Sequence, residues 1–212
     1  MKQTFLFLAI FFLNSFAQKI HCDSDSDCFY LPKKAKGKSP ALIYLSCTGA
    51  TEKDMREMKK VGDSLGWVLA TCHKAKKRRD FWLNDKDITK TYEKLIKNYP
   101  VDSSRVFLYG FSAMGVQALL TLFLHPEKFR GVISVCAHSQ VLPFARWQRL
   151  KDKLIYLISR EKDWNLSDNR YLHKVFQENG LRDTLVITPG EHNIGDTKEL
   201  LKAAVWLNKN SR

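Results

Sequence analysis

Short, continuous apolar runs recur along the chain and alternate with stretches in which apolar residues stand three or four positions apart. The runs predict strands that are buried in a parallel sheet, and the spaced stretches predict amphipathic helices. The expected strands occupy residues 28–32, 41–45, 67–71, 106–109, 132–135, 154–158 and 185–187. The expected helices contain residues 55–65, 88–96, 171–176 and 200–205, together with a stretch that runs from Gly115 to His125-Pro126.

This alternation of strand and helix predicts one α/β domain, in which helices cover both faces of a mainly parallel sheet. No internal repeat, low-complexity tract or linker divides the chain. In such a sheet, ligands bind where the carboxyl ends of the strands meet. Residues that directly follow a strand are therefore the candidates for chemistry.

The first 17 residues have a different character from the rest of the chain. Lys2 precedes an apolar run over residues 5–13, and small residues precede a possible cleavage position after Ala17. This pattern predicts a secretory signal peptide over residues 1–17, a folded domain over residues 18–212, and a secreted or periplasmic protein. The run is too short for a membrane anchor, and the alternative is an uncleaved anchor or a buried N-terminal helix.

The chain is strongly basic, with a formal net charge of +13 that falls to +12 if residues 1–17 are removed, because Lys2 is their only charged residue. The densest basic block spans residues 74–79. No aromatic residues interleave with this block, and no nucleic-acid-binding module is recognisable. We therefore expect a solvated loop that makes at most weak contact with anionic surfaces, and no nucleic-acid partner.

Five cysteines become relevant if the protein is exported, because disulfides form in oxidising compartments. Cys22 and Cys28 flank a short acidic loop and could close it. Cys47 and Cys72 each come at the end of an expected strand, so they could lie near one another if those strands are neighbours. Cys136 is then left over as a buried small hydrophobe. The spacings match no zinc site, so neither a metal nor a cofactor is expected.

The most informative segment leads from the strand at residues 106–109 through Gly110-Phe111-Ser112-Ala113-Met114-Gly115 into a helix. A strand, a sharp turn built on small residues and a helix place a serine hydroxyl on an exposed corner above the sheet. The backbone N–H groups at the start of the helix favour developing negative charge. The usual G-x-S-x-G pattern has glycine two positions after the serine, whereas this chain has Met114 there.

Two later strand ends carry the partners that such a serine needs. Asp163 follows the strand at 154–158, and His192 follows the strand at 185–187. The chain order of serine, aspartate and histidine, each after its own strand, is the order of an α/β-hydrolase. His192 would take the proton of Ser112, and Asp163 would orient and stabilise the imidazole.

Other residues near these positions compete for the same roles. Glu161 and Asp168 are alternatives to Asp163 as the acid. His138 follows the strand at 132–135 and could line the site, although a structural or solvent-facing role fits its position better. Cys47 is a poor alternative nucleophile, because the sequence places no separate base for it.

From residue 29 to the C-terminus, the chain resembles a small secreted member of the α/β-hydrolase superfamily. The nearest resemblance is to the branch of polyhydroxybutyrate depolymerase-like and feruloyl-esterase-like proteins. The resemblance rests on the motifs at residues 29–32, 99–106, 110–113, 125–131, 161–163 and 190–192. It implies a serine esterase with a single-domain fold that acts through Ser112, Asp163 and His192.

The loop after the first central strand departs from this family. The family usually carries His-Gly there, whereas this chain has Ser46-Cys47-Thr48-Gly49. The resemblance implies that the loop supplies one oxyanion N–H, from Thr48 or Cys47, and that Ala113 supplies the other. A backbone donor does not require a particular side chain, so the function is expected to survive the change.

The sequence thus predicts a metal-independent serine hydrolase that cleaves carboxylic esters through an acyl-enzyme. Residues 137–151, with Phe144, Trp147 and Leu150, leave room for a partial lid and for no full cap domain. An open site of this kind would accept bulky or polymeric esters. The alternatives are a serine peptidase of the same fold and a non-catalytic binding protein with a basic surface.

Overall fold

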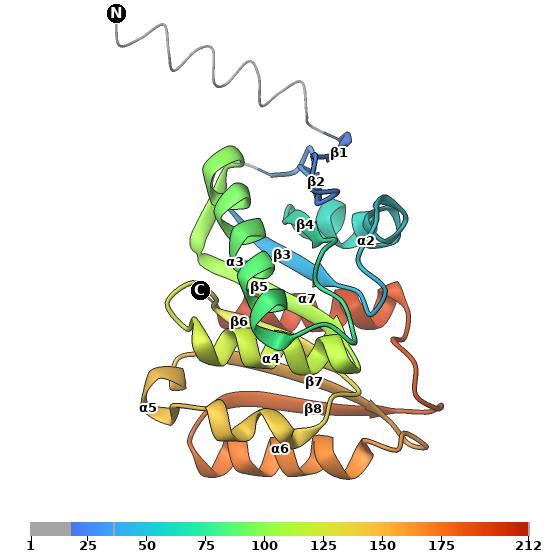
Figure 1. Ribbon diagram of the computed structural model, residues 1–212, viewed down its shortest axis with the longest axis vertical. Coiled ribbons are helices and arrows are strands. Elements are labelled where there is room, and N and C mark those ends of the chain that lie inside the picture. Colours follow the sequence, from blue (N-terminus) through green and yellow to red (C-terminus); the bar gives the residue numbers. More distant parts are fainter. Residues whose placement is uncertain (1–17, 36, 212) are drawn as a thin grey trace, which may run out of the picture.

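The predicted alternation is realised as an eight-stranded, mainly parallel sheet with helices on both faces (Figure 1). The computed structural model describes residues 18–35 and 37–211, so the expected signal peptide lies outside the described residues. The sheet order is β1-β2-β4-β3-β5-β6-β7-β8, and only the pairings of β1 with β2 and of β2 with β4 are antiparallel. The strands are β1 (Ile20–Cys22), β2 (Cys28–Tyr30), β3 (Ser39–Leu45), β4 (Val68–Cys72), β5 (Val101–Phe111), β6 (Gly131–Val135), β7 (Leu154–Arg160) and β8 (Arg182–Thr188).

The helices form two layers, one on each face of the sheet, and each layer packs on its own apolar core. Side chains alternate across a strand, so Ile43 of β3 joins one core and its neighbour Leu42 joins the other. The first core includes buried residues of α3 (Phe81–Asn98), α4 (Ala113–Leu124) and α6 (Leu166–Glu178). The second includes those of α2 (Glu52–Leu65) and α7 (Thr197–Asn210). The expected single α/β domain with helices on both faces is confirmed.

The structure also contains elements that the apolar pattern did not predict. β1 is an edge strand of three residues, and β5 begins at Val101, several residues before the predicted run. The segment between β6 and β7 forms a 3₁₀ helix, η1 (Ser139–Phe144), and the one-turn helix α5 (Trp147–Leu150). Within residues 18–35 and 37–211, no helix combines the length and the apolarity needed to cross a membrane.

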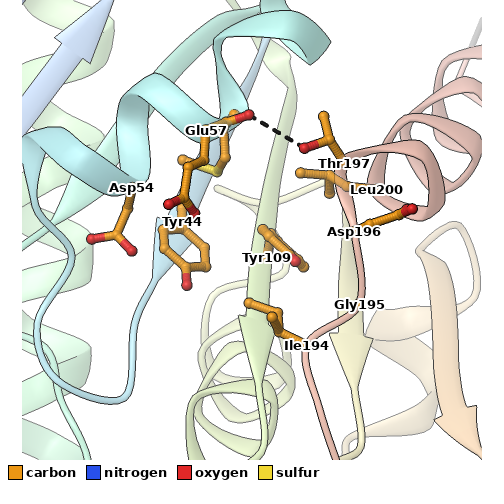
Figure 2. A pocket seen from close by; sticks show the side chains of 10 residues that line it. Tyr44, Asp54, Glu57, Tyr109, Ile194, Gly195, Asp196, Thr197 and Leu200 are labelled. Carbon is orange, nitrogen blue, oxygen red and sulfur yellow. Dashed lines mark hydrogen bonds between the residues drawn. The ribbon is translucent and has the colours of Figure 1, made fainter. Parts of the chain in front are cut away.

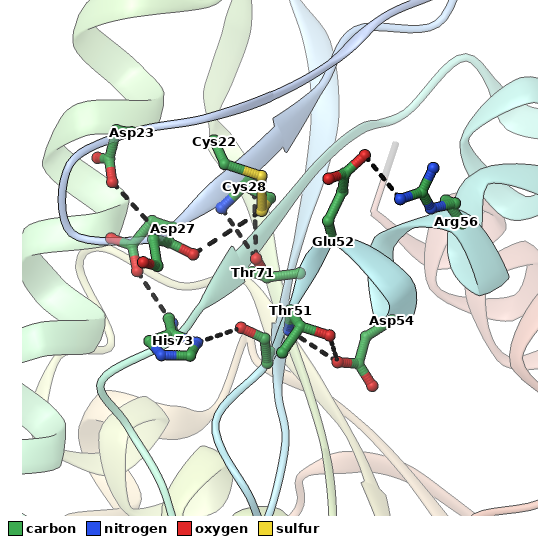
Figure 3. Close-up of a disulfide and its surroundings, with 12 residues drawn as sticks. Cys22, Asp23, Asp27, Cys28, Thr51, Glu52, Asp54, Arg56, Thr71 and His73 are labelled. Carbon is green, nitrogen blue, oxygen red and sulfur yellow. Dashed lines mark hydrogen bonds and ion pairs between the residues drawn. A yellow bond between two sulfur atoms is a disulfide. The ribbon is translucent and has the colours of Figure 1, made fainter.

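A disulfide between Cys22 and Cys28 closes the acidic loop, a pairing that the sequence left possible (Figure 3). The two cysteines face each other across the β1–β2 pair. Asp27, at the end of the loop, is 4 % exposed and accepts hydrogen bonds from the His73 backbone N–H at 2.9 Å and the Thr91 hydroxyl at 2.9 Å. The hairpin is therefore fixed to β4 and α3 by a buried carboxylate as well as by the covalent bond.

The same acidic loop also neutralises several lysines. The Lys94 ammonium lies 2.6 Å from Asp23, 2.8 Å from Asp25 and 3.0 Å from Asp27. Asp25 also binds Lys74 and Lys90, and these three ammonium groups hold the pKa of the Asp25 carboxyl well below its usual range. Part of the basic block at residues 74–79 is thus paired within the protein.

A second possible pairing of cysteines does not form. β3 and β4 are neighbours, but their register sets Leu45 opposite Cys72, so Cys47 lies beyond the end of β4. Cys72 is buried in the core, and the Cys47 thiol donates to the Phe111 carbonyl at 3.2 Å. Both thiols are free, so this possible pair does not form although the two strands are neighbours.

Candidate active site

Ser112 occupies a sharp corner between β5 and α4. Its φ of 56° is in the region that residues with a Cβ rarely adopt, and its N–H donates to the Val135 carbonyl of the neighbouring strand at 2.8 Å. A Cβ added to Gly110 would lie 2.2 Å from the Met114 carbonyl oxygen. The chain can therefore turn this tightly only because Gly110 has no side chain.

Met114, the departure from the usual pattern, is accommodated in the core. Its side chain is 1 % exposed and joins the apolar cluster on the α3, α4 and α6 side of the sheet. Gly115 occupies the close contact of the helix with the sheet, because a Cβ there would meet Ser134 Oγ at 3.0 Å and the Gly110 carbonyl at 3.1 Å. A glycine one position later in the helix thus serves the packing between β6 and α4.

The structure brings Ser112, His192 and Asp163 into one hydrogen-bonded row. Ser112 Oγ lies 2.9 Å from His192 Nε2, and His192 Nδ1 lies 3.0 Å from Asp163 Oδ1. The loops that carry the acid and the histidine are joined by a hydrogen bond from the Lys162 N–H to the Gly190 carbonyl at 3.0 Å. Three positions that are distant in sequence therefore meet at the carboxyl edge of the sheet.

Asp163 is held as a carboxylate by donors around it. Burial alone would raise its pKa, but hydrogen bonds from the Cys136 thiol, the Asn165 N–H and His192 outweigh burial and bring the pKa of Asp163 below its ordinary value. The Asn165 N–H lies 2.7 Å from Asp163 Oδ1, and the Asn165 amide donates to the Cys136 carbonyl at 3.0 Å. An ionised Asp163 is suited to orient the neighbouring imidazole and to stabilise it when it is protonated.

Cys136 completes a group that could in principle hold a metal ion. Ligand atoms of Cys136, Asp163 and His192 all lie within 4.8 Å of one another, the one such group among the residues described. Burial, followed by the nearby Asp163 carboxylate, raises the pKa of the Cys136 thiol to about 12. A protonated thiol donates hydrogen bonds, and the Cys136 thiol donates to the Asn193 carbonyl, next to His192, at 3.6 Å.

The loop at residues 46–50 contacts the residue before Ser112, and its part in an oxyanion hole stays a prediction. The Cys47 carbonyl accepts a hydrogen bond from the Lys77 N–H at 3.1 Å, and the Cys47 thiol reaches Phe111 next to Ser112. The Thr48 N–H is 3.4 Å from the Ser46 hydroxyl within its own turn, whereas Ala113 opens α4 and has no earlier helical carbonyl to bind. The contact of the Cys47 thiol thus joins this loop to the corner that carries Ser112.

The competing candidates lie elsewhere. Glu161 is exposed, and Asp168 accepts hydrogen bonds from the backbone and hydroxyl of Ser139, which ties α6 to η1. His138 is half-buried, and its Nδ1 has no hydrogen-bond partner among the residues described. None of the three makes a hydrogen bond to Ser112 or His192 within the described part of the chain.

The expected lid segment, residues 137–151, packs against the body of the domain. Trp147 lies edge-on to Phe123 of α4 at 6.4 Å and to Phe176 of α6 at 6.3 Å, and Leu150 is fully buried. Phe144 is 43 % exposed and contacts the exposed Trp82 ring at 6.0 Å. The segment therefore covers α4 and α6 and adds no cap domain.

A small cavity of about 60 Å³ lies on the α2 and α7 side of the sheet, close in sequence to His192 (Figure 2). Its walls include the rings of Tyr44 and Tyr109, which have centroids 5.1 Å apart and are tilted by 32°, and the segment from Ile194 to Thr197. Burial raises the pKa of Tyr44 to about 12, so its hydroxyl stays neutral. This cavity is separate from the Ser112 corner.

Sequence reasoning missed Arg160, which supports the histidine loop. Its side chain is 1 % exposed, forms two hydrogen bonds of 2.8 Å to Glu199 of α7, and also binds Thr188. Its Nε donates to the Asn193 carbonyl, directly after His192, at 3.3 Å. The only sequence signal was an arginine at the end of a buried strand, where an unpaired charge would be unfavourable.

Sequence reasoning also missed two aromatic residues beside the imidazole. The Trp164 ring stacks on His192 with centroids 3.8 Å apart and an interplanar angle of 23°. The Phe111 ring lies 4.7 Å from the same imidazole. Each directly neighbours a candidate in sequence, Trp164 after Asp163 and Phe111 before Ser112, and this adjacency was the available signal.

Several solved structures share this fold. An esterase of Pyrobaculum calidifontis matches with a TM-score of 0.72 and 14% identity, over 97% of this chain and 90% of that chain. A ferulic acid esterase matches with a TM-score of 0.72 and 15% identity, over 92% and 97% of the two chains. A putative dipeptidyl aminopeptidase IV of Bacteroides ovatus matches with a TM-score of 0.68 and 16% identity over 87% of this chain, which spans only 33% of that longer protein. No curated protein sequence matches the chain.

The sequence model of the prolyl oligopeptidase family (Peptidase_S9) matches residues 70–188. The matched region contains Ser112 and Asp163 and ends shortly before His192. Because the match covers more than half of the chain and the fold agrees with it, the protein belongs to the prolyl oligopeptidase family and is a serine hydrolase of the α/β-hydrolase fold.

Proposed function

We propose that this protein hydrolyses carboxylic esters with Ser112 as the nucleophile, His192 as the general base and Asp163 as the acid that orients the imidazole. The supporting observation is the hydrogen-bonded row in which Ser112 Oγ lies 2.9 Å from His192 Nε2 and His192 Nδ1 lies 3.0 Å from Asp163. A serine hydroxyl is a weak nucleophile until a base within hydrogen-bond reach removes its proton. This row supplies such a base and a carboxylate behind it.

The reaction proceeds in two steps. Ser112 Oγ bonds to the acyl carbon while its proton moves to His192 Nε2, and His192 then gives that proton to the departing alcohol. Water attacks the acyl-enzyme in the second step, with His192 again accepting and returning the proton. The N–H groups of Ala113 and of the Cys47–Thr48 loop stabilise the oxyanion in both steps.

Reactivity of Ser112 tests this proposal directly. A fluorophosphonate should label the wild-type protein and should fail to label Ser112→Ala, with parallel loss of hydrolysis of short-chain aryl esters. Ser103→Ala is the matched control, because Ser103 is exposed at the opposite end of the same strand and should keep full labelling. Labelling of Ser112→Ala at the wild-type rate would refute the assignment of the nucleophile.

Peptidase activity is the second candidate, because the family match and one structural neighbour are named for peptidases. Aryl esters and the corresponding aryl amides, including prolyl amides, distinguish the two functions when they are compared on the same enzyme preparation. We expect esters to be cleaved and prolyl amides to be left intact. Efficient cleavage of the amides, lost in Ser112→Ala, would establish the peptidase instead.

Export belongs to the proposal as well. The Cys22–Cys28 disulfide is consistent with an oxidising compartment and therefore with removal of residues 1–17 and secretion to the periplasm or beyond. The exposed residues Lys76, Lys77 and Arg78 of the basic block leave room for weak contact with anionic surfaces. N-terminal sequencing of the exported protein tests the cleavage site, which we expect after Ala17.

A further inference from the structure

Trp164 combines high exposure with a close contact to the candidate base. The side chain is 72 % exposed, yet its ring stacks on the His192 imidazole at 3.8 Å with the planes 23° apart. The His192 side chain is itself only 9 % exposed. A tryptophan that is exposed in this way forms the outer wall of the active site rather than part of a core.

The backbone on both sides of Trp164 is fixed, which keeps the ring in place. Asp163 before it is buried, and its carboxylate accepts the Asn165 N–H at 2.7 Å. Asn165 after it donates its side-chain amide to the Cys136 carbonyl at 3.0 Å. The indole is therefore held over the imidazole by the same short segment that supplies the acid.

We propose that Trp164 is a positioning residue for His192. Its indole stabilises the protonated imidazole of the transition state and holds the imidazole ring between Ser112 and Asp163. This inference rests on the proposed function of the same site. When the proton moves from Ser112 Oγ to His192 Nε2, the ring becomes a cation, and the negative face of an indole attracts a cation. The stack also opposes rotation of the imidazole, which would break its bonds to Ser112 and Asp163 together.

The other ionisable groups that face this imidazole come from neighbouring elements. The Asp163 carboxylate contributes from the loop after β7, and the Cys136 thiol contributes from the end of β6. Arg160 contacts the histidine loop, but its guanidinium is paired with Glu199. Substitution of Trp164 removes none of these groups, so a change in pH dependence reports on the indole itself.

Three variants separate the electrostatic effect of the ring from simple coverage. Trp164→Leu keeps an apolar cover but has no π face, and Trp164→Phe keeps a weaker π face. Trp82→Leu is the control, because it removes another exposed tryptophan, whose ring contacts Phe144. We expect Trp164→Leu to lower kcat roughly 3- to 30-fold at unchanged KM. The pH at which activity is lost on the acid side should also move lower, because the imidazolium has lost its partner.

Trp164→Phe should recover most of kcat, and Trp82→Leu should match the wild type. Wild-type kcat in Trp164→Leu would overturn the inference. An effect confined to KM would overturn it as well, because it would mean that the exposed indole binds substrate. Thermal unfolding of each variant checks that the fold is intact, and an exposed side chain of this kind should change stability little.

A second measurement does not depend on catalysis. In the inactive Ser112→Ala protein, protonation of His192 should quench the fluorescence of the stacked indole, and the transition should vanish in Ser112→Ala/Trp164→Phe. Absence of a pH transition that depends on Trp164 would refute the contact. If the fluorescence transition is present but the wild-type protein cleaves no ester or amide, the proposed function fails and the contact between Trp164 and His192 is upheld. If the wild-type protein cleaves esters and the Trp164 variants have wild-type activity, only this inference fails.

Discussion

Gly110→Ala is expected to disable the proposed active site while leaving the fold in place. The added Cβ would lie 2.2 Å from the Met114 carbonyl oxygen and 2.5 Å from the Met114 carbonyl carbon. Ordinary van der Waals contact begins near 3.4 Å, whereas the added Cβ would lie only 2.2 Å from the Met114 carbonyl oxygen. The first turn of α4 must therefore move away from β5 by about 1 Å. The obstructing atoms are backbone, and no side-chain rotation can relieve the clash.

The retreat moves Ser112 with the helix. His192 and Asp163 stand on separate loops that Gly110 does not touch, so the Ser112–His192 distance of 2.9 Å cannot be kept by a joint shift. A misplacement of about 1 Å in a reacting group costs roughly 100-fold in rate. Forcing an extra methyl group into a packed site lowers the free energy of unfolding by about 1–3 kcal/mol.

The assay compares two glycine variants of similar stability. Gly180→Ala places a Cβ where no atom lies within 4 Å, at a residue with a φ of +70°, far from the site in the turn after α6. Its cost is conformational, about 1 kcal/mol, and its ester turnover and fluorophosphonate labelling should equal those of the wild type. Gly110→Ala should lose roughly 100-fold in both readouts. Wild-type labelling of Gly110→Ala would refute the argument that this glycine sets the position of Ser112.

Three further predictions follow from charged groups. Arg160→Met should lower the unfolding free energy by about 3–5 kcal/mol and reduce kcat, since it leaves Glu199 unpaired and frees the loop of His192. Glu199→Gln keeps a hydrogen-bond acceptor but leaves the buried Arg160 charge uncompensated, so it should also destabilise the protein in urea unfolding. Lys94→Met should lower the unfolding free energy by about 1–3 kcal/mol, and high salt should shrink the difference from wild type, which distinguishes lost ion pairs from lost packing. Because the native pKa of Asp163 lies below its ordinary value, its stabilising contribution is complete above the unfolded pKa of about 3.9 and is lost as the pH falls through the native value. The urea midpoints of wild type and Asp163→Asn should therefore converge as the pH falls below about 3.9. A constant difference across that range would contradict the ionised state of Asp163.

Much of the site could be predicted because it depends on local pattern and on topology. Buried apolar runs identify the strands, and parallel strands bring their carboxyl ends to one edge, so Ser112, Asp163 and His192 could be grouped without coordinates. Gly110 was recognisable as the residue that permits the tight turn. The short edge strand β1 carries no comparable signal, because it contains no apolar run. It belongs to a hairpin that is closed by a disulfide.

The remainder depends on tertiary contacts that periodicity does not encode. The partner of Arg160 is Glu199, which stands 39 positions later on α7. The stack of Trp164 on His192 requires two loops to meet, and the free Cys47 and Cys72 depend on a register offset between β3 and β4. Met114 departed from the expected motif because packing of α4 on the sheet is satisfied by a glycine one position later.

The strained corners of the site are carried by the sheet itself. Ser112 and Cys136 are both non-glycine residues with positive φ, 56° and 53°, and each directly follows a central strand. Each also extends the parallel ladder by one bond, from the Ser112 N–H to the Val135 carbonyl at 2.8 Å and from the Cys136 N–H to the Ile158 carbonyl at 2.7 Å. Such a conformation costs about 1–3 kcal/mol and persists where neighbouring structure fixes it. The ladder bonds fix both corners, so that the Ser112 hydroxyl faces His192 and the Cys136 thiol faces Asp163. The arrangement of the proposed active site therefore depends on the carboxyl ends of β5, β6 and β7. Substitutions that loosen these strand ends should reduce activity before they unfold the domain.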